Sequence, residues 1–238
     1  MSESIHRNHR KRMRERFWKQ GLEGMLDHET LEMLLYFAMP RVDTNPIAHR
    51  LIHTFGSLHG ALDASPSQLK EVQGMGENSV LLLSFLHELI RRYALDKNEQ
   101  ETKGIRLIDD ETIGQYVVPY FLGMKEECMI VFAIDGKGRV MGVKEVSRGS
   151  VRTTEVNMRK IVEFALHSCA ADLIIAHNHP GGKAVPSRQD MEVTIQIRNL
   201  LSNLGIRLRD HIVVVEKEYS SILSAMNKQK KEPLAEQE

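Results

Sequence analysis

Cysteine is scarce in this sequence of 238 residues, and the two cysteines present lie far apart. Cys128 and Cys169 stand outside any C-x-x-C or similar spacing that would predict a zinc cluster or a redox pair. Disulfide frameworks belong to oxidising compartments, so two isolated thiols favour a reducing compartment. We expect both cysteines to be small, buried apolar residues rather than reactive groups.

Net charge and long apolar runs are lacking as well. The 32 basic and 32 acidic residues cancel, which excludes a molecule that binds nucleic acid through its overall charge. No apolar run approaches the roughly 20 residues of a transmembrane helix, and the N-terminus lacks the apolar core of a signal peptide. We therefore expect a cytoplasmic protein without membrane contact. Residues 6–20 form a basic stretch that predicts either contacts with phosphates or an acidic partner, or a solvated terminus or amphipathic helix.

The sequence predicts two domains that differ in secondary structure. Residues 21–94 carry apolar residues at helical intervals and predict a small all-α domain, preceded by the basic segment 1–20. Residues 95–104 are polar and turn-forming, which predicts a linker. Strand-like and helical segments alternate from 105 to 227, and this alternation predicts a layered α/β or α+β domain. The charged tail, residues 228–238, is predicted to be disordered.

The pattern also predicts the order of elements in the second domain. Two strands joined by a GKG turn come first, followed by a helix, a buried strand, an amphipathic helix capped by Gly205, a strand and a short final helix. The corresponding segments are 127–135, 139–147, 157–170, 171–177, 188–205, 206–218 and the residues from about 219.

Two histidines one residue apart end the buried strand in LIIAHNHPGGKAVPSRQD, residues 173–190. Side chains at positions i and i+2 of a strand point to the same side, so His177 and His179 can aim at one point. A proline and two glycines then turn the chain, and Ser187 with Asp190 fits the start of the next helix. Two imidazoles and a carboxylate suit Zn²⁺ with a fourth position for water, whose pKa the metal lowers towards about 7.

A capped helix without any metal would explain part of this pattern. S-x-x-D is a capping motif by itself, and a single H-x-H pair is weak evidence for a ligand set. The combination of H-x-H-P, two glycines and S-x-x-D at the next helix start favours the metal site. The other histidines, His87, His167 and His211 among them, have no ligand spacing and are expected to be packing or surface groups.

The spacing resembles the JAMM motif of the MPN-domain metalloproteins. The fuller string HNHPGGKAVPSRQD, together with RDHIVVVEKEYSSI, SRG and MRKIVEFAL, is similar to the RadC family in particular. The resemblance covers nearly all of residues 105–226, and FGSLHGALDASPSQLKEVQGMGENSV in the first domain is similar to that family's helix-hairpin-helix-like segment. It implies an N-terminal all-α domain followed by an MPN/JAMM α/β domain of the cytidine-deaminase-like, three-layer type.

The resemblance also implies a hydrolytic site. One zinc ion per chain would be held by His177, His179 and Asp190. Ser187 would help to stabilise a tetrahedral intermediate. An upstream glutamate would act as general base on the attacking water, and Glu127 matches that position.

Two details qualify the resemblance. Alignment back from Asp135 favours Glu127 over Glu126 as the general base. Family members commonly have Ser where Gly181 stands and Pro where Ala184 stands, so substrate contacts are expected to differ while the ligand positions stay intact.

The first domain carries a possible nucleic-acid contact at Gly74-Met75-Gly76. In helix-hairpin-helix motifs such a turn exposes backbone N–H groups at a helix N-terminus, which can hold a DNA phosphate. Glu77 opposes this because it repels phosphate, and no Lys or Arg follows before Arg91. The alternative is a hairpin that only packs helices or binds a protein.

Three functions are compatible with these features. The first is a zinc-dependent metallopeptidase or isopeptidase acting on a peptide or protein substrate. The second is a DNA-associated protein of repair or recombination, as the family's historical name suggests, with the metal site secondary or structural. The third is a scaffold with structural zinc, which the open fourth coordination position argues against.

Overall fold

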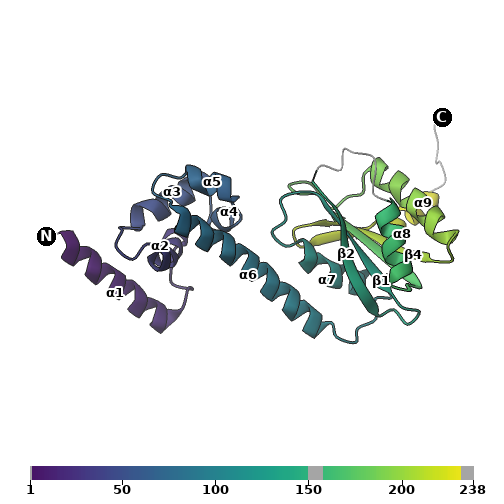
Figure 1. Ribbon diagram of the computed structural model, residues 1–238, viewed down its shortest axis with the longest axis horizontal. Coiled ribbons are helices and arrows are strands. Elements are labelled where there is room, and N and C mark those ends of the chain that lie inside the picture. The colour runs from purple at the N-terminus through teal and green to yellow at the C-terminus, as the bar shows by residue number, and fades with distance from the viewer. Residues whose placement is uncertain (1, 150–157, 232–238) are drawn as a thin grey trace. The chain divides into compact units, whose positions relative to one another are not determined.

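The computed structural model of the chain describes residues 2–149 and 158–231 (Figure 1). The chain divides into two units, Met1–Arg92 and Tyr93–Glu238. In the described residues the first unit contains only helices, whereas the second combines helices with a five-stranded sheet. The mixed α+β class predicted from the sequence is therefore confirmed.

The helices of the first unit bury a single apolar cluster. Its fully buried members include Leu31 and Leu35 of one helix and Leu51 of the next, which recur at the intervals that predicted helices. Gly56, with φ of +82°, ends the third helix in the left-handed conformation that glycine favours. The helices are α1 (Ser2–Gln20), α2 (Asp27–Ala38), α3 (Asn45–Phe55), α4 (Leu58–Leu62), α5 (Pro66–Glu71) and α6 (Glu77–Glu101).

The prediction that residues 95–104 form a turn-rich linker is wrong for residues 95–101, which are helical. Helix α6 continues to Glu101, and the division between the two units falls inside it, between Arg92 and Tyr93. Polar residues at consecutive positions also suit a helix that is exposed on most of its surface, so polarity alone did not distinguish the two structures. Asn98 is buried here, and its side-chain amide donates to the carbonyl oxygen of Tyr116 at 3.0 Å.

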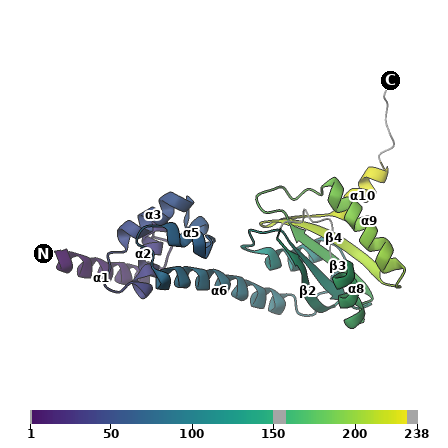
Figure 2. The ribbon, with the colours of Figure 1, turned by 45° about the horizontal axis from the view of Figure 1, so that its top comes forward.

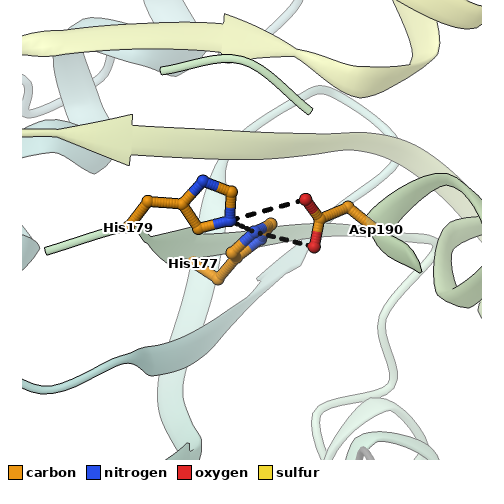
Figure 3. A group of neighbouring side chains, drawn as sticks. All are labelled: His177, His179 and Asp190. Carbon is orange, nitrogen blue, oxygen red and sulfur yellow. Dashed lines mark hydrogen bonds and ion pairs between the residues drawn. The ribbon is translucent and has the colours of Figure 1, made fainter. Parts of the chain in front are cut away.

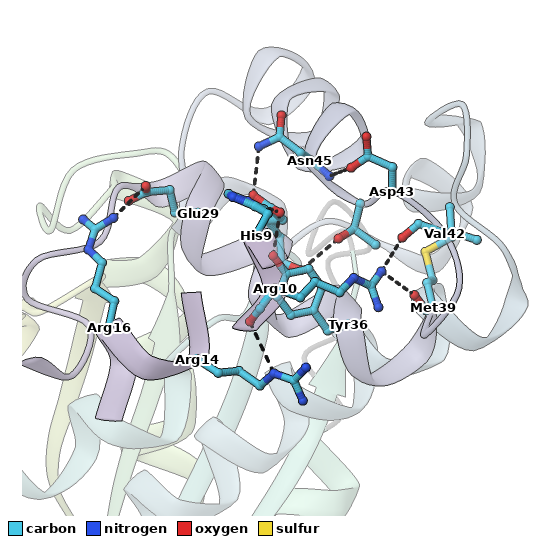
Figure 4. A network of polar contacts seen from close by, with 12 residues as sticks. His9, Arg10, Arg14, Arg16, Glu29, Tyr36, Met39, Val42, Asp43 and Asn45 are labelled. Carbon is cyan, nitrogen blue, oxygen red and sulfur yellow. Dashed lines mark hydrogen bonds and ion pairs between the residues drawn. The ribbon is translucent and has the colours of Figure 1, made fainter. Parts of the chain in front are cut away.

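One face of helix α1 is held against the rest of the first unit by basic side chains (Figure 4). The His9 Nε2 donates to Glu32 Oε1 at 2.9 Å, and Arg16 pairs with Glu29 at 2.8 Å. The Arg10 guanidinium lies 4.4 Å from the centre of the Tyr36 ring and donates to the backbone carbonyls that follow α2, those of Met39, Pro40 and Val42. Residues 2–20 therefore form a helix with one face packed against the unit rather than a solvated terminus, and contact with phosphates or an acidic partner stays a prediction.

The opposite face of α1 carries exposed cations and one aromatic ring. Trp18 is 83% exposed. The surrounding exposed basic residues are Lys11, Arg12, Arg14 and Lys19. We call these five residues the outer face of α1.

Glu32 is the buried centre of the contacts between α1 and the remaining helices. It is 1% exposed and accepts hydrogen bonds from the Tyr36 hydroxyl at 2.6 Å and the Asn45 amide at 2.8 Å, besides His9.

Because Glu32→Ala leaves these donors without an acceptor, we expect it to lower the free energy of unfolding by about 2–4 kcal/mol. Urea unfolding followed by circular dichroism measures the change. Glu23→Ala, at an exposed position, should stay within about 0.5 kcal/mol, and equal midpoints for the two variants would contradict the role of Glu32.

The second unit is built on a mixed sheet with the strand order β2-β1-β3-β4-β5. Strands β3 and β4 are parallel, and the other neighbouring pairs are antiparallel. The predicted hairpin and the buried strand are both present. The elements are α7 (Asp110–Val117), the 3₁₀ helix η1 (Val118–Phe121), β1 (Cys128–Ile134), β2 (Val140–Arg148), α8 (Met158–His167), β3 (Asp172–Asn178), α9 (Arg188–Ser202), β4 (Arg207–Val215), β5 (Glu218–Ser221) and α10 (Ile222–Lys231).

Helices cover both faces of this sheet, which gives three layers (Figure 2). Alternate residues of β1 divide between two apolar clusters, as strand periodicity requires. Cys128, Ile130 and Phe132 face α7 and η1, whereas Met129 and Val131 face α8 and α9. The three-layer arrangement expected from the family resemblance is therefore present.

Three sequence-based expectations for the second unit are corrected. The helix predicted from about Tyr219 begins at Ile222, because residues 218–221 pair with β4 as strand β5. Helix α10 also extends to Lys231, into the tail 228–238 predicted to be disordered, whose residues 232–238 lie outside the described residues. Cys169 is exposed rather than buried, because it occupies the turn after α8 with φ of +48°.

No helix in residues 2–149 or 158–231 combines the length and the apolar character that a bilayer crossing requires.

Candidate metal centre

The two histidines and the aspartate of the sequence motif converge at the end of β3 (Figure 3). The Nε2 atoms of His177 and His179 are 3.0 Å apart. Asp190, in the first turn of α9, places Oδ1 at 3.2 Å from the first of these nitrogens and Oδ2 at 3.4 Å from the second. Potential ligand atoms of three residues, from a strand end and a helix start, therefore point at one another.

These separations fit a tetrahedral zinc ion. Two ligand atoms held at about 2.0–2.1 Å from Zn²⁺ with tetrahedral angles lie about 3.3 Å from each other. The two nitrogens are 3.0 Å apart, and each lies 3.2 or 3.4 Å from the nearer Asp190 oxygen, Oδ1 for His177 and Oδ2 for His179, which is close to that requirement. With one ligand atom taken from each residue, the three atoms lie within 4.8 Å of one another. Among the described residues, no second group of three His, Cys, Asp or Glu side chains converges in this way.

Ser187 caps helix α9, as the sequence predicts, and shares its carboxylate partner with the histidines. Its backbone N–H and its hydroxyl both donate to Asp190 Oδ2, at 2.7 and 2.6 Å, and the Asp190 N–H donates back to Ser187 Oγ at 3.1 Å. The cap holds the carboxylate in one orientation while Oδ1 faces His177. The same Asp190 carboxylate therefore serves both the helix cap and the ligand cluster, so the two interpretations of the sequence motif do not exclude each other.

The charges of the cluster are coupled. Burial alone would raise the pKa of Asp190, but hydrogen bonds from His177, His179 and the Ser187 hydroxyl hold that pKa far below its usual range. The hydrogen bond to Asp190 raises the pKa of His179 against the opposing effect of burial. Asp190 is therefore ionised at neutral pH, and the raised pKa of His179 means that a metal has to compete with protons for this nitrogen.

Glu127 lies beside the cluster, immediately before β1. It is half-buried, and its negative charge contributes to the raised pKa of His179. Met129, two residues further on, is paired with His177 across the antiparallel ladder, so strand alternation puts Glu127 on the face of the sheet that carries His177. Glu126, the other candidate from the sequence, is exposed.

Asn178, between the two histidines, joins the end of β3 to the start of β1. Its side-chain oxygen accepts from the Cys128 N–H at 2.7 Å, and its amide donates to the Glu126 carbonyl at 3.0 Å. These two hydrogen bonds fix the backbone on both sides of Glu127. This role of Asn178 is not predictable from the sequence, because a polar residue in a strand carries no local signal of a partner fifty positions away.

His211 is buried beneath His177. Its Nε2 lies 2.9 Å from His177 Nδ1, and its Nδ1 lies 2.7 Å from the hydroxyl of Thr194 in α9. Burial lowers the pKa of His211 well below its ordinary value, and the nearby His177 acts in the same direction. The prediction that His211 is a packing or surface group missed this contact, whereas His167 does lie at the surface.

The two glycines proposed for nucleic-acid contact form a turn before α6. Gly74 has φ of +97° and packs closely, since a Cβ there would lie 3.0 Å from Ile47 Cγ1. The Gly76 N–H donates to Ser79 Oγ at 2.9 Å, so this amide is already used at the N-terminus of α6. Phosphate binding at this turn remains a prediction, and it has to rely on groups other than the Gly76 amide.

Asp210 precedes His211 and gives a pH-dependent prediction. Its side chain is 3% exposed, and burial raises its pKa from 3.8 to about 6 despite hydrogen bonds from the Ser221 hydroxyl and the His211 N–H. Because the folded state binds this proton more tightly than the unfolded chain does, the stabilisation is present below about pH 4 and is lost as the pH rises through 6. This loss amounts to about 3 kcal/mol. A ¹³C carboxyl titration of Asp210 with a midpoint near 4 would contradict the expectation.

A mixed five-stranded sheet between helical layers, with an H-x-H…S-x-x-D cluster at the end of a parallel strand, is the JAB/MPN class of domain. The chain belongs to the RadC-like JAB domain family, whose sequence profile matches residues 107–229. Residues 6–81 match a second family, described as UPF0758 N-terminal. The resemblance seen in the motifs is thereby confirmed.

Three relatives are similar over most of their length. A UPF0758 protein of Fusobacterium nucleatum is 35% identical over 94% of this chain and 98% of the relative. A UPF0758 protein of Ruegeria pomeroyi is 34% identical over 87% of this chain and 92% of the relative. A UPF0758 protein of Rhodobacter capsulatus is 36% identical over 85% and 93%. The likeness therefore extends over both units and not only over the metal centre.

Proposed function

We propose that the protein is a zinc-dependent metallohydrolase of the JAMM type that cleaves a peptide or isopeptide bond. The observation that carries the proposal is the convergence of His177 Nε2, His179 Nε2 and the Asp190 carboxylate at separations of 3.0 to 3.4 Å. Structural zinc sites take four protein ligands, whereas catalytic sites take three and keep one position for water. Membership of the RadC-like JAB domain family supports the same class of site.

Glu127 and Ser187 are assigned different roles in the proposed hydrolysis. When bound, zinc supplies a lowered pKa for water and polarises the scissile carbonyl. Glu127 is the proposed general base, which takes a proton from the attacking water and passes it to the leaving amine. Ser187 is the proposed donor to the developing oxyanion, once its hydroxyl rotates from Asp190 Oδ2 towards the substrate oxygen.

Metal removal tests the proposal. The purified, untagged protein is assayed against a panel of peptide and isopeptide substrates before chelation, after chelation and after zinc is restored. We expect hydrolysis to be lost with the metal and to return with zinc, because the proposed nucleophile needs the metal to form near neutral pH. Metal content is measured on the same samples, and hydrolysis that survives complete removal would rule the proposal out.

The outer face of α1 favours a second candidate, a DNA-associated protein of repair or recombination in which the metal site is secondary or structural. Its four exposed cations can neutralise phosphates against the opposing charge of Glu15, which lies 3.9 Å from Lys11, and the exposed Trp18 ring can stack on an unpaired base. The cations on the other side of the helix, Arg10 and Arg16, are used inside the unit. The two candidates are compatible in one molecule.

Salt-dependent binding to duplex, branched and single-stranded DNA tests this second candidate. Replacing Lys11, Arg12, Arg14 and Lys19 by Gln should reduce the salt slope by about 3, since each phosphate contact contributes about 0.7–0.9. Point substitutions are preferable to removal of residues 1–20, which would also expose the buried Glu32. The exposed lysines Lys137 and Lys217 provide control substitutions in the second unit. Binding without a salt slope would exclude the candidate.

A further inference from the structure

We propose that Thr194 and His211 act as positioning residues that keep the proton of His177 on Nδ1 and so leave His177 Nε2 free to bind the metal. The inference rests on the proposed metal site and adds two residues that lie outside the H-x-H…S-x-x-D motif. The evidence is a chain of hydrogen bonds that runs from the Asp190 carbonyl through Thr194 and His211 to His177. The donor of each bond in this chain is determined by the bond before it.

The line begins at Thr194, which is fully buried in α9. Its hydroxyl has one hydrogen, and that hydrogen is donated to the Asp190 carbonyl oxygen at 2.6 Å. A carbonyl oxygen can only accept, so the direction of this bond is fixed. The contact at 2.7 Å between Thr194 Oγ1 and His211 Nδ1 therefore has to run the other way, with the imidazole as donor.

The position of the proton on His211 determines which nitrogen of His177 donates. Its side chain is fully buried, and its two ring nitrogens face a hydroxyl and another imidazole rather than a carboxylate, so a charged ring would be costly. A neutral imidazole has one N–H, which Thr194 places on Nδ1, and its Nε2 is then an acceptor. The 2.9 Å contact thus requires His177 Nδ1 to donate to His211 Nε2.

The consequence for His177 concerns its other nitrogen. Because Nδ1 donates its hydrogen to His211, the neutral ring of His177 has its lone pair on Nε2, the atom that faces His179 and Asp190. A neutral imidazole without such a partner can carry its proton on either nitrogen, and the form with N–H at Nε2 cannot bind a metal there. Loss of an outer partner of a metal-binding histidine typically lowers metal affinity by about 10–100-fold.

The test reads proton positions and zinc affinity in the same full-length protein. Long-range ¹H–¹⁵N correlation spectra of the metal-free protein at about pH 8 report which nitrogen of each neutral histidine carries the proton. We expect Nδ1–H for both His211 and His177. Thr194→Val removes the acceptor while keeping the shape of the side chain. It should make the Nε2–H form of His177 predominate and weaken zinc binding by about 10–100-fold in competition with a chromophoric chelator.

Thr194→Ser is the matched control, because it restores the hydroxyl. It should return both the Nδ1–H signals and the zinc affinity to wild-type values. A purely structural role of the threonine methyl, which valine keeps and serine lacks, would instead weaken the Ser variant and leave the Val variant at wild-type affinity. An Nε2–H signal for His177 in the wild type, or wild-type zinc affinity in Thr194→Val, would overturn the inference. The spectra need neither metal nor substrate, so a protein with the expected proton positions that binds no zinc would refute the proposed function alone.

Discussion

Glu127→Gln is expected to keep its zinc and to lose hydrolysis, with kcat lower by about 10²–10⁴-fold, the usual contribution of a general base. Glutamine has nearly the volume of glutamate and keeps an acceptor oxygen, so the backbone that Asn178 holds on either side should stay in place. It cannot take a proton from the attacking water. Turnover and metal content are measured on one preparation, because loss of zinc would produce the same defect for another reason.

Glu126→Gln provides the control for this substitution. Glu126 is the neighbouring carboxylate, it is exposed, and only its backbone carbonyl has a hydrogen bond near the site, which the substitution leaves unchanged. We expect wild-type kcat. If Glu126→Gln were the inactive variant and Glu127→Gln the active one, Glu126 would be the general base and the assignment of Glu127 would be wrong by one residue.

The double substitution His177→Ala/His179→Ala is expected to abolish zinc binding. The purified wild type should contain about one zinc per chain, as a three-ligand site predicts, and the double variant close to none. One carboxylate cannot hold zinc against competing water and buffer, and Asp190 also remains engaged by the Ser187 cap. Elemental analysis of untagged protein measures the difference.

His167→Ala is the matched control for the loss of zinc. His167 is an exposed histidine near the end of α8, and its Nδ1 lies against the Glu163 carbonyl rather than near the cluster. Its removal should leave the zinc content unchanged. Zinc retained in the double variant would show that the metal is bound elsewhere, and circular dichroism distinguishes loss of the site from loss of the fold.

The ligand cluster was predictable because its residues are close in sequence and each follows a local rule. The two histidines follow strand alternation, and Ser187 with Asp190 follows the rule for helix caps. Glu127 was not predictable in this way. Its position came from the family resemblance, since a glutamate before a strand has the same local pattern whether it faces solvent or a metal.

The supporting residues were missed because they depend on how the strands pair. His211 reaches His177 across 34 positions of sequence, through the parallel register of β3 with β4. Thr194 reaches His211 across 17 positions, through the packing of α9 on the sheet. Neither register nor packing is encoded in a local pattern. The same holds for the predicted linker, where a polar run fitted an exposed helix as well as a turn.

The position of the only tryptophan has a spectroscopic consequence. Trp18 is already surrounded by water on the outer face of α1, so unfolding should hardly change its emission, and intrinsic fluorescence is a poor reporter of stability for this chain. It should instead be a good reporter of contact. A ligand that covers the outer face of α1 would shift or quench the emission, so the fluorescence of Trp18 reports binding at that face directly.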